Sequence, residues 1–61
     1  MRDTNRIWPF CNELATLWSK HPDLRFGQIV VNLIRQAQAE GIRDIFFLED
    51  DEMLDLIRRH L

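Results

Sequence analysis

The segment of residues 21–28, His-Pro-Asp-Leu-Arg-Phe-Gly-Gln, restricts the fold of this chain more than any other. Pro22 disfavours the helical conformation for the residue before it, so a helix that approaches from the N-terminal side must end at His21. Asp23 is a favourable N-cap residue, because its carboxylate can accept a hydrogen bond from an unpaired N–H group of a first helical turn. The segment therefore predicts a sharp junction between two helices, of which the second starts at about residue 24.

Apolar residues on both sides of this junction recur every three or four positions, which predicts helices with one buried face. The first helix spans about residues 8–20 and follows a looser turn, because a proline such as Pro9 is tolerated only in the first turn of a helix. The second helix spans about residues 24–40. Gly41 and the apolar Ile42 after it are typical of a helix that ends in a Schellman motif.

A third helix is predicted for about residues 50–60, where acidic residues at the start and basic residues at the end complement the helix dipole. The segment between the second and third helices, residues 42–48, is rich in β-branched and aromatic residues. No other part of the chain alternates with period two, so this segment has no partner strand and is predicted to be a connector with one helical turn after Asp44. The chain is thus predicted to be all-α, a compact three-helix domain formed by residues 1–61.

The same periodicity predicts which side chains form the core. In the first helix the inward residues are Ile7, Phe10, Cys11, Leu14, Leu17 and Trp18. In the second they are Phe26, Ile29, Val30, Leu33, Ile34 and Ala37. In the third they are Met53, Leu54, Ile57 and Leu61, with Leu56 at the edge. Trp8 lies off the stripe and is either an exposed aromatic residue or, as we favour, a lid on the core. Gly27 is expected to allow close approach of the first helix.

The chain has 61 residues and a formal net charge of −2. A chain of this length buries only about 60% of the surface that its unfolded form exposes, and a homodimer is one way for so small a core to gain burial. Residues 1–31 carry a net charge of +1 and residues 32–61 a net charge of −3. The basic excess that is usual in proteins held to nucleic acid by phosphate contacts is therefore absent from the sequence.

Cys11 is the only cysteine, which rules out an intrachain disulfide and a zinc site made of thiolates from one chain. The sequence has neither a secretory signal pattern nor a run of ~20 apolar residues that could span a membrane. From these features we expect a soluble protein of the reducing cytoplasm.

Residue patterns that would indicate catalysis or metal binding are weak. The acidic run of residues 49–52 offers oxygen ligands for a hard cation, but it lacks the spaced ligands and the turn glycine of an EF-hand loop, and helix capping explains its charges. We expect Cys11 to behave as a small core residue, and a histidine at a helix end, such as His21, complements the dipole. His60 follows two arginines at the end of the third helix. We therefore expect no enzyme activity, no catalytic residues, no cofactor and no metal.

The second helix has a polar face formed by Gln28, Asn32, Arg35 and Gln36, which are spaced to lie on one side. Three interpretations of this face are open: a solvated surface, a protein interface, or a recognition surface for nucleic acid. Gln, Asn and Arg side chains can form paired hydrogen bonds with base edges, and two helices joined by a short turn are typical of a helix-turn-helix. The acidic total and the absence of a Lys/Arg fringe favour the first two interpretations.

The run of residues 18–28, which reads Trp-x-x-x-Pro-Asp-Leu-Arg-Phe-Gly-Gln, resembles a motif in a group of small bacterial and phage proteins. In these proteins, too, an acidic run and a final amphipathic helix follow. The resemblance covers roughly residues 14–57. The connector of that group often reads Asp-Pro-Phe-Tyr, whereas residues 44–47 here read Asp-Ile-Phe-Phe. The resemblance implies a compact helical fold and no particular chemistry.

We therefore predict a small protein-interaction or regulatory accessory module, encoded by a bacterium, phage or mobile element, with another protein or a second copy as its partner. The alternative is a helix-turn-helix DNA-binding protein that uses the second helix. The candidate partner-binding residues are Arg25, Gln28, Asn32, Arg35, Gln36, Asp50 and Asp51.

Overall fold

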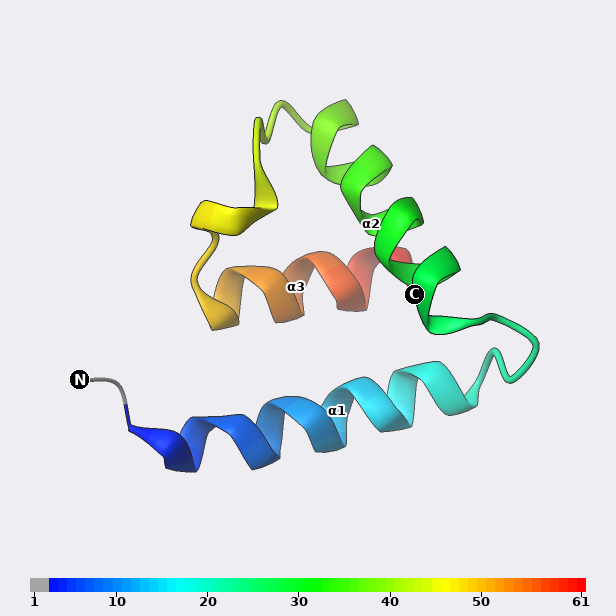
Figure 1. Ribbon diagram of the computed structural model, residues 1–61, viewed down its shortest axis with the longest axis vertical. Coiled ribbons are helices and arrows are strands. Elements are labelled where there is room, and N and C mark those ends of the chain that lie inside the picture. Colours follow the sequence, from blue (N-terminus) through cyan, green and yellow to red (C-terminus); the bar gives the residue numbers. More distant parts are fainter. Residues whose placement is uncertain (1–2) are drawn as a thin grey trace.

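The structure, a computed structural model, describes residues 3–61 and contains three α-helices. These are α1 (Ile7–Ser19), α2 (Phe26–Ala39) and α3 (Asp50–His60). Two short 3-10 helices, η1 (Thr4–Arg6) and η2 (Ile45–Phe47), precede α1 and α3 respectively, and the described residues contain no strand (Figure 1). The prediction of an all-α three-helix architecture is confirmed.

The first and last helices, α1 and α3, lie side by side and run in the same direction (Figure 1). Polar contacts join them in chain order, as expected for parallel helices in register. These contacts link Arg6 to Asp50, Glu13 to Arg58, and His21 to the backbone oxygen of Leu61. The middle helix, α2, packs across the C-terminal half of α3 and connects the two.

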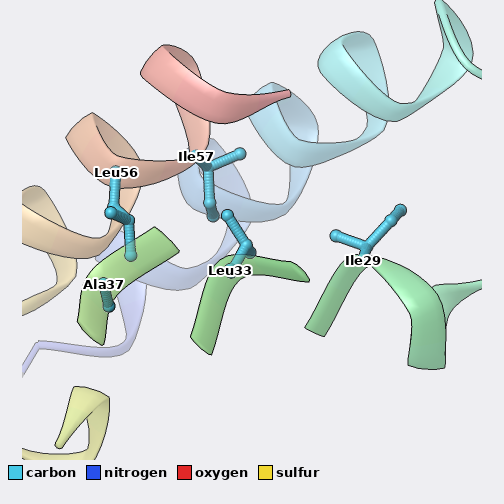
Figure 2. Packing of buried hydrophobic residues seen from close by; sticks show 5 residues of the cluster. All are labelled: Ile29, Leu33, Ala37, Leu56 and Ile57. Atoms are coloured by element: carbon cyan, nitrogen blue, oxygen red, sulfur yellow. The ribbon is translucent and has the colours of Figure 1, made fainter. Parts of the chain in front are cut away.

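The core consists of five buried apolar residues where α2 crosses α3. These are Ile29, Leu33 and Ala37 of α2 and Leu56 and Ile57 of α3 (Figure 2). The α2 residues follow the i, i+4, i+8 spacing of one helix face, which is why periodicity identified all three. Leu56, however, was expected at the edge of the α3 stripe, and its exposed fraction is 0%. Because α2 crosses α3 at this point, Leu56 lies at the centre of the interface.

The helix α1 contributes no fully buried residue and covers the core with one narrow face. Half-buried side chains of this face pack against the core, namely those of Phe10, Leu14, Leu17 and Trp18. The predicted burial of Ile7 and Cys11 is wrong, because both are exposed on the flank of this face. Trp8 is 75% exposed, so our preference for a lid on the core is also wrong and the alternative, an exposed aromatic residue, is correct.

The start of α1 confirms the looser turn expected before Pro9. The Asp3 carboxylate accepts a hydrogen bond from the backbone N–H of Asn5 at 2.9 Å and caps the 3-10 turn that leads into the helix. Pro9 is the third residue of α1, within its first turn, where the missing N–H group has no intrahelical partner to lose.

The junction between α1 and α2 ends the first helix as predicted but starts the second one differently. A turn, closed by a 3.1 Å hydrogen bond from the N–H of Leu24 to the carbonyl of His21, holds Pro22 and Asp23 at its centre. Helix α2 therefore begins at Phe26, and the prediction that Asp23 caps it is wrong. The side-chain oxygen of Gln28 instead accepts a 2.9 Å hydrogen bond from the N–H of Arg25.

Two contacts of Trp18 hold this junction in place. Its indole Nε1–H donates a 2.8 Å hydrogen bond to the carbonyl of Leu24, and its ring lies 5.7 Å from that of Phe26, centroid to centroid. The ring of Phe26 is nevertheless half exposed, so its predicted place in the core is wrong. The close helix approach expected at Gly27 is wrong as well, because a Cβ atom there would meet nothing within 4 Å.

The end of α2 confirms the Schellman motif. Gly41 has a φ angle of +86°. The N–H of Ile42 donates a 2.9 Å hydrogen bond to the carbonyl of Ala37, and the N–H of Gly41 donates one of 3.0 Å to the carbonyl of Gln38. Ile34, one turn before, is more exposed than predicted, because it lies beside the buried face of the helix and not on it.

The connector forms the helical turn expected after Asp44, whose carboxylate accepts a 2.9 Å hydrogen bond from the N–H of Phe46. Ile45 and Leu48 pack against the core. The side chains of Phe46 and Phe47 point away from the core and are almost fully exposed.

Candidate interaction surfaces

The predicted polar face of α2 is exposed, and most of it is unpaired. The side chains of Asn32, Arg35 and Gln36 form neither hydrogen bonds nor ion pairs with any residue in the described part of the chain. Gln28 differs, because its amide oxygen caps the backbone at the start of the helix. The exposed side of α2 therefore carries a row of three polar side chains that have no structural task within the described fold.

Arg25 stands at the N-terminal end of this row. Its backbone is extended, its N–H group is bonded to Gln28, and its guanidinium forms no ion pair within residues 3–61. The start of the row thus combines a structural hydrogen bond with an exposed positive charge.

The two candidate residues of the acidic run, Asp50 and Asp51, are engaged inside the fold. Asp50 forms an ion pair with Arg6, which ties the start of α3 to the start of α1. Asp51 accepts a 2.9 Å hydrogen bond from the N–H of Glu52, whose own carboxylate accepts one of 3.0 Å from the N–H of Glu49. The acidic run therefore lies at the start of a helix and caps it, as anticipated from sequence.

Two glutamates form ion pairs with the end of α3. Glu13 of α1 accepts two hydrogen bonds from the guanidinium of Arg58, and these bonds hold the pKa of the Glu13 carboxyl below its ordinary value of 4.5. Glu40, which follows α2, accepts hydrogen bonds from Arg59 and His60, and these lower its pKa in the same way. The same contact with Glu13 raises the pKa of Arg58.

Residues that could act as nucleophiles or soft metal ligands are separated from one another. His21 contacts the backbone oxygen of Leu61 at 3.0 Å, His60 contacts Glu40, and Cys11 is exposed on α1. Within residues 3–61, no three His, Cys, Asp or Glu side chains are grouped so that they could hold a metal ion.

An open groove of about 570 Å³ separates the first turns of α1 and α3. Its lining combines the apolar side chains of Pro9, Phe10 and Leu54 with several carboxylates. Arg6 also lines the groove and pairs with Asp50, so part of the negative charge of the lining is neutralised.

Exposed apolar side chains form surfaces that periodicity did not identify as surfaces. The rings of Phe46 and Phe47 pack edge to face at the tip of the connector, with their centroids 5.1 Å apart.

A second exposed apolar surface lies on α1, where Trp8, Cys11 and Ala15 are exposed. Near the end of that helix, an apolar hollow of about 260 Å³ is lined by Ala15, Trp18, Ser19 and Pro22. The 3–4–3–4 spacing of residues 8, 11, 15, 18 and 22 is a sequence signal that could have revealed this second stripe.

Comparison with known proteins gives no relative for this chain: no family model, curated protein or solved structure matches it. None of the helices in the described part is long and apolar enough to cross a membrane.

Proposed function

We propose that this chain is a small protein-interaction module without catalytic activity, and that it binds a protein partner through the polar face of α2. The observation that carries the proposal is the row of Asn32, Arg35 and Gln36, exposed and without partners in the described fold. A partner can form hydrogen bonds with these groups without first breaking internal ones, so little of the binding free energy is lost. The acidic start of α3, the other surface considered from sequence, is less suitable because its groups are already engaged.

The absence of an assembled nucleophile supports a non-catalytic role. A catalytic cysteine requires a base within hydrogen-bond distance, and Cys11 forms no hydrogen bond with any described residue. The proposal places the module in the cytoplasm of a bacterium, because a lone thiol stays reduced there and because residues 18–28 resemble the bacterial and phage motif. A phage or other mobile element is the source that the same resemblance supports.

The proposal is tested by affinity capture with the parent chain and with the double variant Arg35→Glu, Gln36→Glu. The matched control is Arg43→Glu, Gln38→Glu, which makes the same chemical changes at exposed positions outside the polar face. The expected result is a stoichiometric partner that the parent and the control retain and the polar-face variant loses. If the polar-face variant retains every partner of the parent, the proposal is wrong.

A second candidate function, DNA binding by α2, is favoured by one observation. The polar face and its N-terminal end carry Arg25 and Arg35 and no carboxylate, so the local charge is positive although that of the chain is negative. This candidate predicts a mobility shift of duplex DNA at low salt that weakens steeply as salt is added and is absent for Arg35→Glu. No shift at low salt would exclude it.

A further inference from the structure

The chain exposes more surface than a monomer of its mass normally does. Its accessible surface is 4943 Å² for a mass of 7.4 kDa. Folded monomers of that mass expose ~4,200 Å². The excess of about 700 Å² is close to the ~800 Å² that each partner buries in a standard protein interface.

Part of this surface is an apolar stripe that runs along one side of α1 and into the turn after it, and Trp18, at the border of the stripe, also packs against the core. The residues of the stripe are Trp8, Cys11, Ala15, Trp18 and Pro22, which we call the α1 seam. Within α1, the alternating spacing of residues 8, 11, 15 and 18 is that of helices that pack in pairs, with the side chains of one helix between those of the other. No other helix of the described fold covers Trp8, Cys11 or Ala15.

The α1 seam is complementary to itself. Trp8 protrudes at one end, and the hollow lined by Ala15, Trp18, Ser19 and Pro22 lies at the other. If two copies of α1 cross in antiparallel orientation about residue 13, residue 8 of one helix lies opposite residue 18 of the other, and residue 11 opposite residue 15. A twofold axis therefore brings each Trp8 to the hollow of the other copy, and the contact forms twice.

The charges on α1 favour a second copy over a charged partner. Glu13 of α1 and Arg6, which precedes the helix, form ion pairs with α3, on the side away from the seam, and Lys20 follows the last residue of the helix. The polar residues beside the seam, Asn12 and Ser19, are neutral. Along the seam itself, between residues 8 and 18, two copies can thus approach without placing like charges opposite each other, which would weaken the contact.

We propose that the protein forms a twofold dimer through the α1 seam, with each Trp8 in the hollow of the other copy. This surface is distinct from the polar face of α2. The Arg35→Glu, Gln36→Glu variant is therefore expected to remain dimeric even where it loses a partner.

The mass of the particle and the reactivity of its single thiol test the dimer. The parent is expected to change from monomer to dimer as its concentration rises, with a blue shift of tryptophan emission as Trp8 leaves water. Over the same range, Cys11 is expected to react with a thiol reagent more slowly, in proportion to the dimer fraction. A parent that stays monomeric, with a thiol rate independent of concentration, would overturn the proposal.

Matched variants test whether the α1 seam is the interface. Ala15→Arg places a charge in the seam, and Ala39→Arg makes the same change at an exposed position of α2. Ala15→Arg is expected to be monomeric at every concentration and helical by circular dichroism, whereas Ala39→Arg is expected to dimerise like the parent. Trp8→Ser, at a position that is 75% exposed in the monomer, is expected to lose the dimer as well and to remain helical by circular dichroism. A dimer that survives both Ala15→Arg and Trp8→Ser, or that Ala39→Arg disrupts equally, uses another surface.

Discussion

Gly27 and Gly41 stand at opposite ends of α2 and have opposite requirements. Gly41 has a positive φ angle, where a side chain is strained, and it supports the two hydrogen bonds of the Schellman motif. Gly27 lies in the first turn of the helix, with a negative φ angle and open space around its Cα. The backbone conformation at position 41 thus requires glycine, whereas the glycine at position 27 only gives the unfolded chain more conformational freedom.

The same substitution at the two glycines is therefore expected to have opposite effects. Gly27→Ala should raise the free energy of unfolding by about 0.4–1 kcal/mol, because it restricts the unfolded chain at no cost to the folded one. Gly41→Ala should lower it by about 1–2 kcal/mol, because a side chain in the left-handed region is strained. Urea denaturation of both variants measures these changes. A loss of stability in Gly27→Ala would contradict the open space around this residue.

Trp8 and Trp18 have different roles at the residue scale. The indole of Trp18 spans the junction between α1 and α2, whereas that of Trp8 is exposed. Trp18→Phe should lower the free energy of unfolding by about 1 kcal/mol, because phenylalanine keeps most of the apolar contact but cannot donate to the carbonyl of Leu24. Trp8→Phe is the control, and in dilute protein it should change stability by less than about 0.5 kcal/mol. Equal effects in urea denaturation would contradict the assigned role of the indole hydrogen bond.

At the scale of elements, ion pairs join the C-terminal end of α3 to the other two helices. Glu13 connects α1 to Arg58 of α3, and Glu40 connects the end of α2 to Arg59 and His60. The middle of the molecule is held by the apolar contacts of α2 with α3. The ion pairs therefore contribute to helix placement in a way that depends on pH.

The pKa values of Glu13 and Glu40 are lower in the folded protein than the ordinary value of 4.5. The two carboxylates therefore contribute their full stabilisation above pH 4.5. This stabilisation is lost as the pH falls from 4.5 through the pKa of the folded state, because the unfolded chain binds more protons in that range. The midpoint of thermal unfolding should decrease over this acidic range. The double variant Glu13→Gln, Glu40→Gln should show a smaller decrease. Parallel curves for parent and variant would show that these ion pairs do not stabilise the fold.

Local signals in the sequence predicted the helix ends well where one residue decides the geometry. Gly41 with Ile42 gave the end of α2, and Pro22 gave the end of α1. The start of α2 was misplaced because Asp23 and Gln28 both offer a capping oxygen, and the turn at Pro22 decides which of them is in reach. That choice depends on how the two helices are placed, which no single residue specifies.

Side-chain burial was harder to predict than helix ends for the same reason. Periodicity gives the face of a helix but not how much of it a neighbour covers. With only two other helices in the described fold, the narrow contact of α1 leaves Ile7 and Cys11 in solvent, and the crossing point of α2 makes Leu56 central. Among the candidate site residues, Gln28, Asp50 and Asp51 proved to have structural tasks. The exposed positions of Asn32, Arg35 and Gln36 could be predicted because they follow from helix periodicity alone. In the described fold, the side chains of these three residues form no hydrogen bond or ion pair.

At the scale of the whole molecule, so few residues are buried that each one matters. Leu56 lies between α2 and α3 with no exposed surface. Leu56→Ala should lower the free energy of unfolding by about 2–5 kcal/mol, because it removes apolar contacts and leaves a cavity. Domains of this size are stable by only ~3–5 kcal/mol, so the variant should lose its cooperative thermal transition. Phe47→Ala, at an exposed site, should keep that transition. A folded Leu56→Ala variant would place the centre of the core elsewhere.

The packing of α1 beside α3 also has a consequence for the order in which the chain can fold during synthesis. Leu56 and Ile57 complete the core, and Arg58 is the partner of Glu13. Until the residues of α3 have left the exit tunnel, α1 and α2 have neither these core residues nor Arg58 to pack against. The native contacts of α1 with α3 can therefore form only after translation of this region is complete, and the fold does not assemble step by step from its N-terminal end.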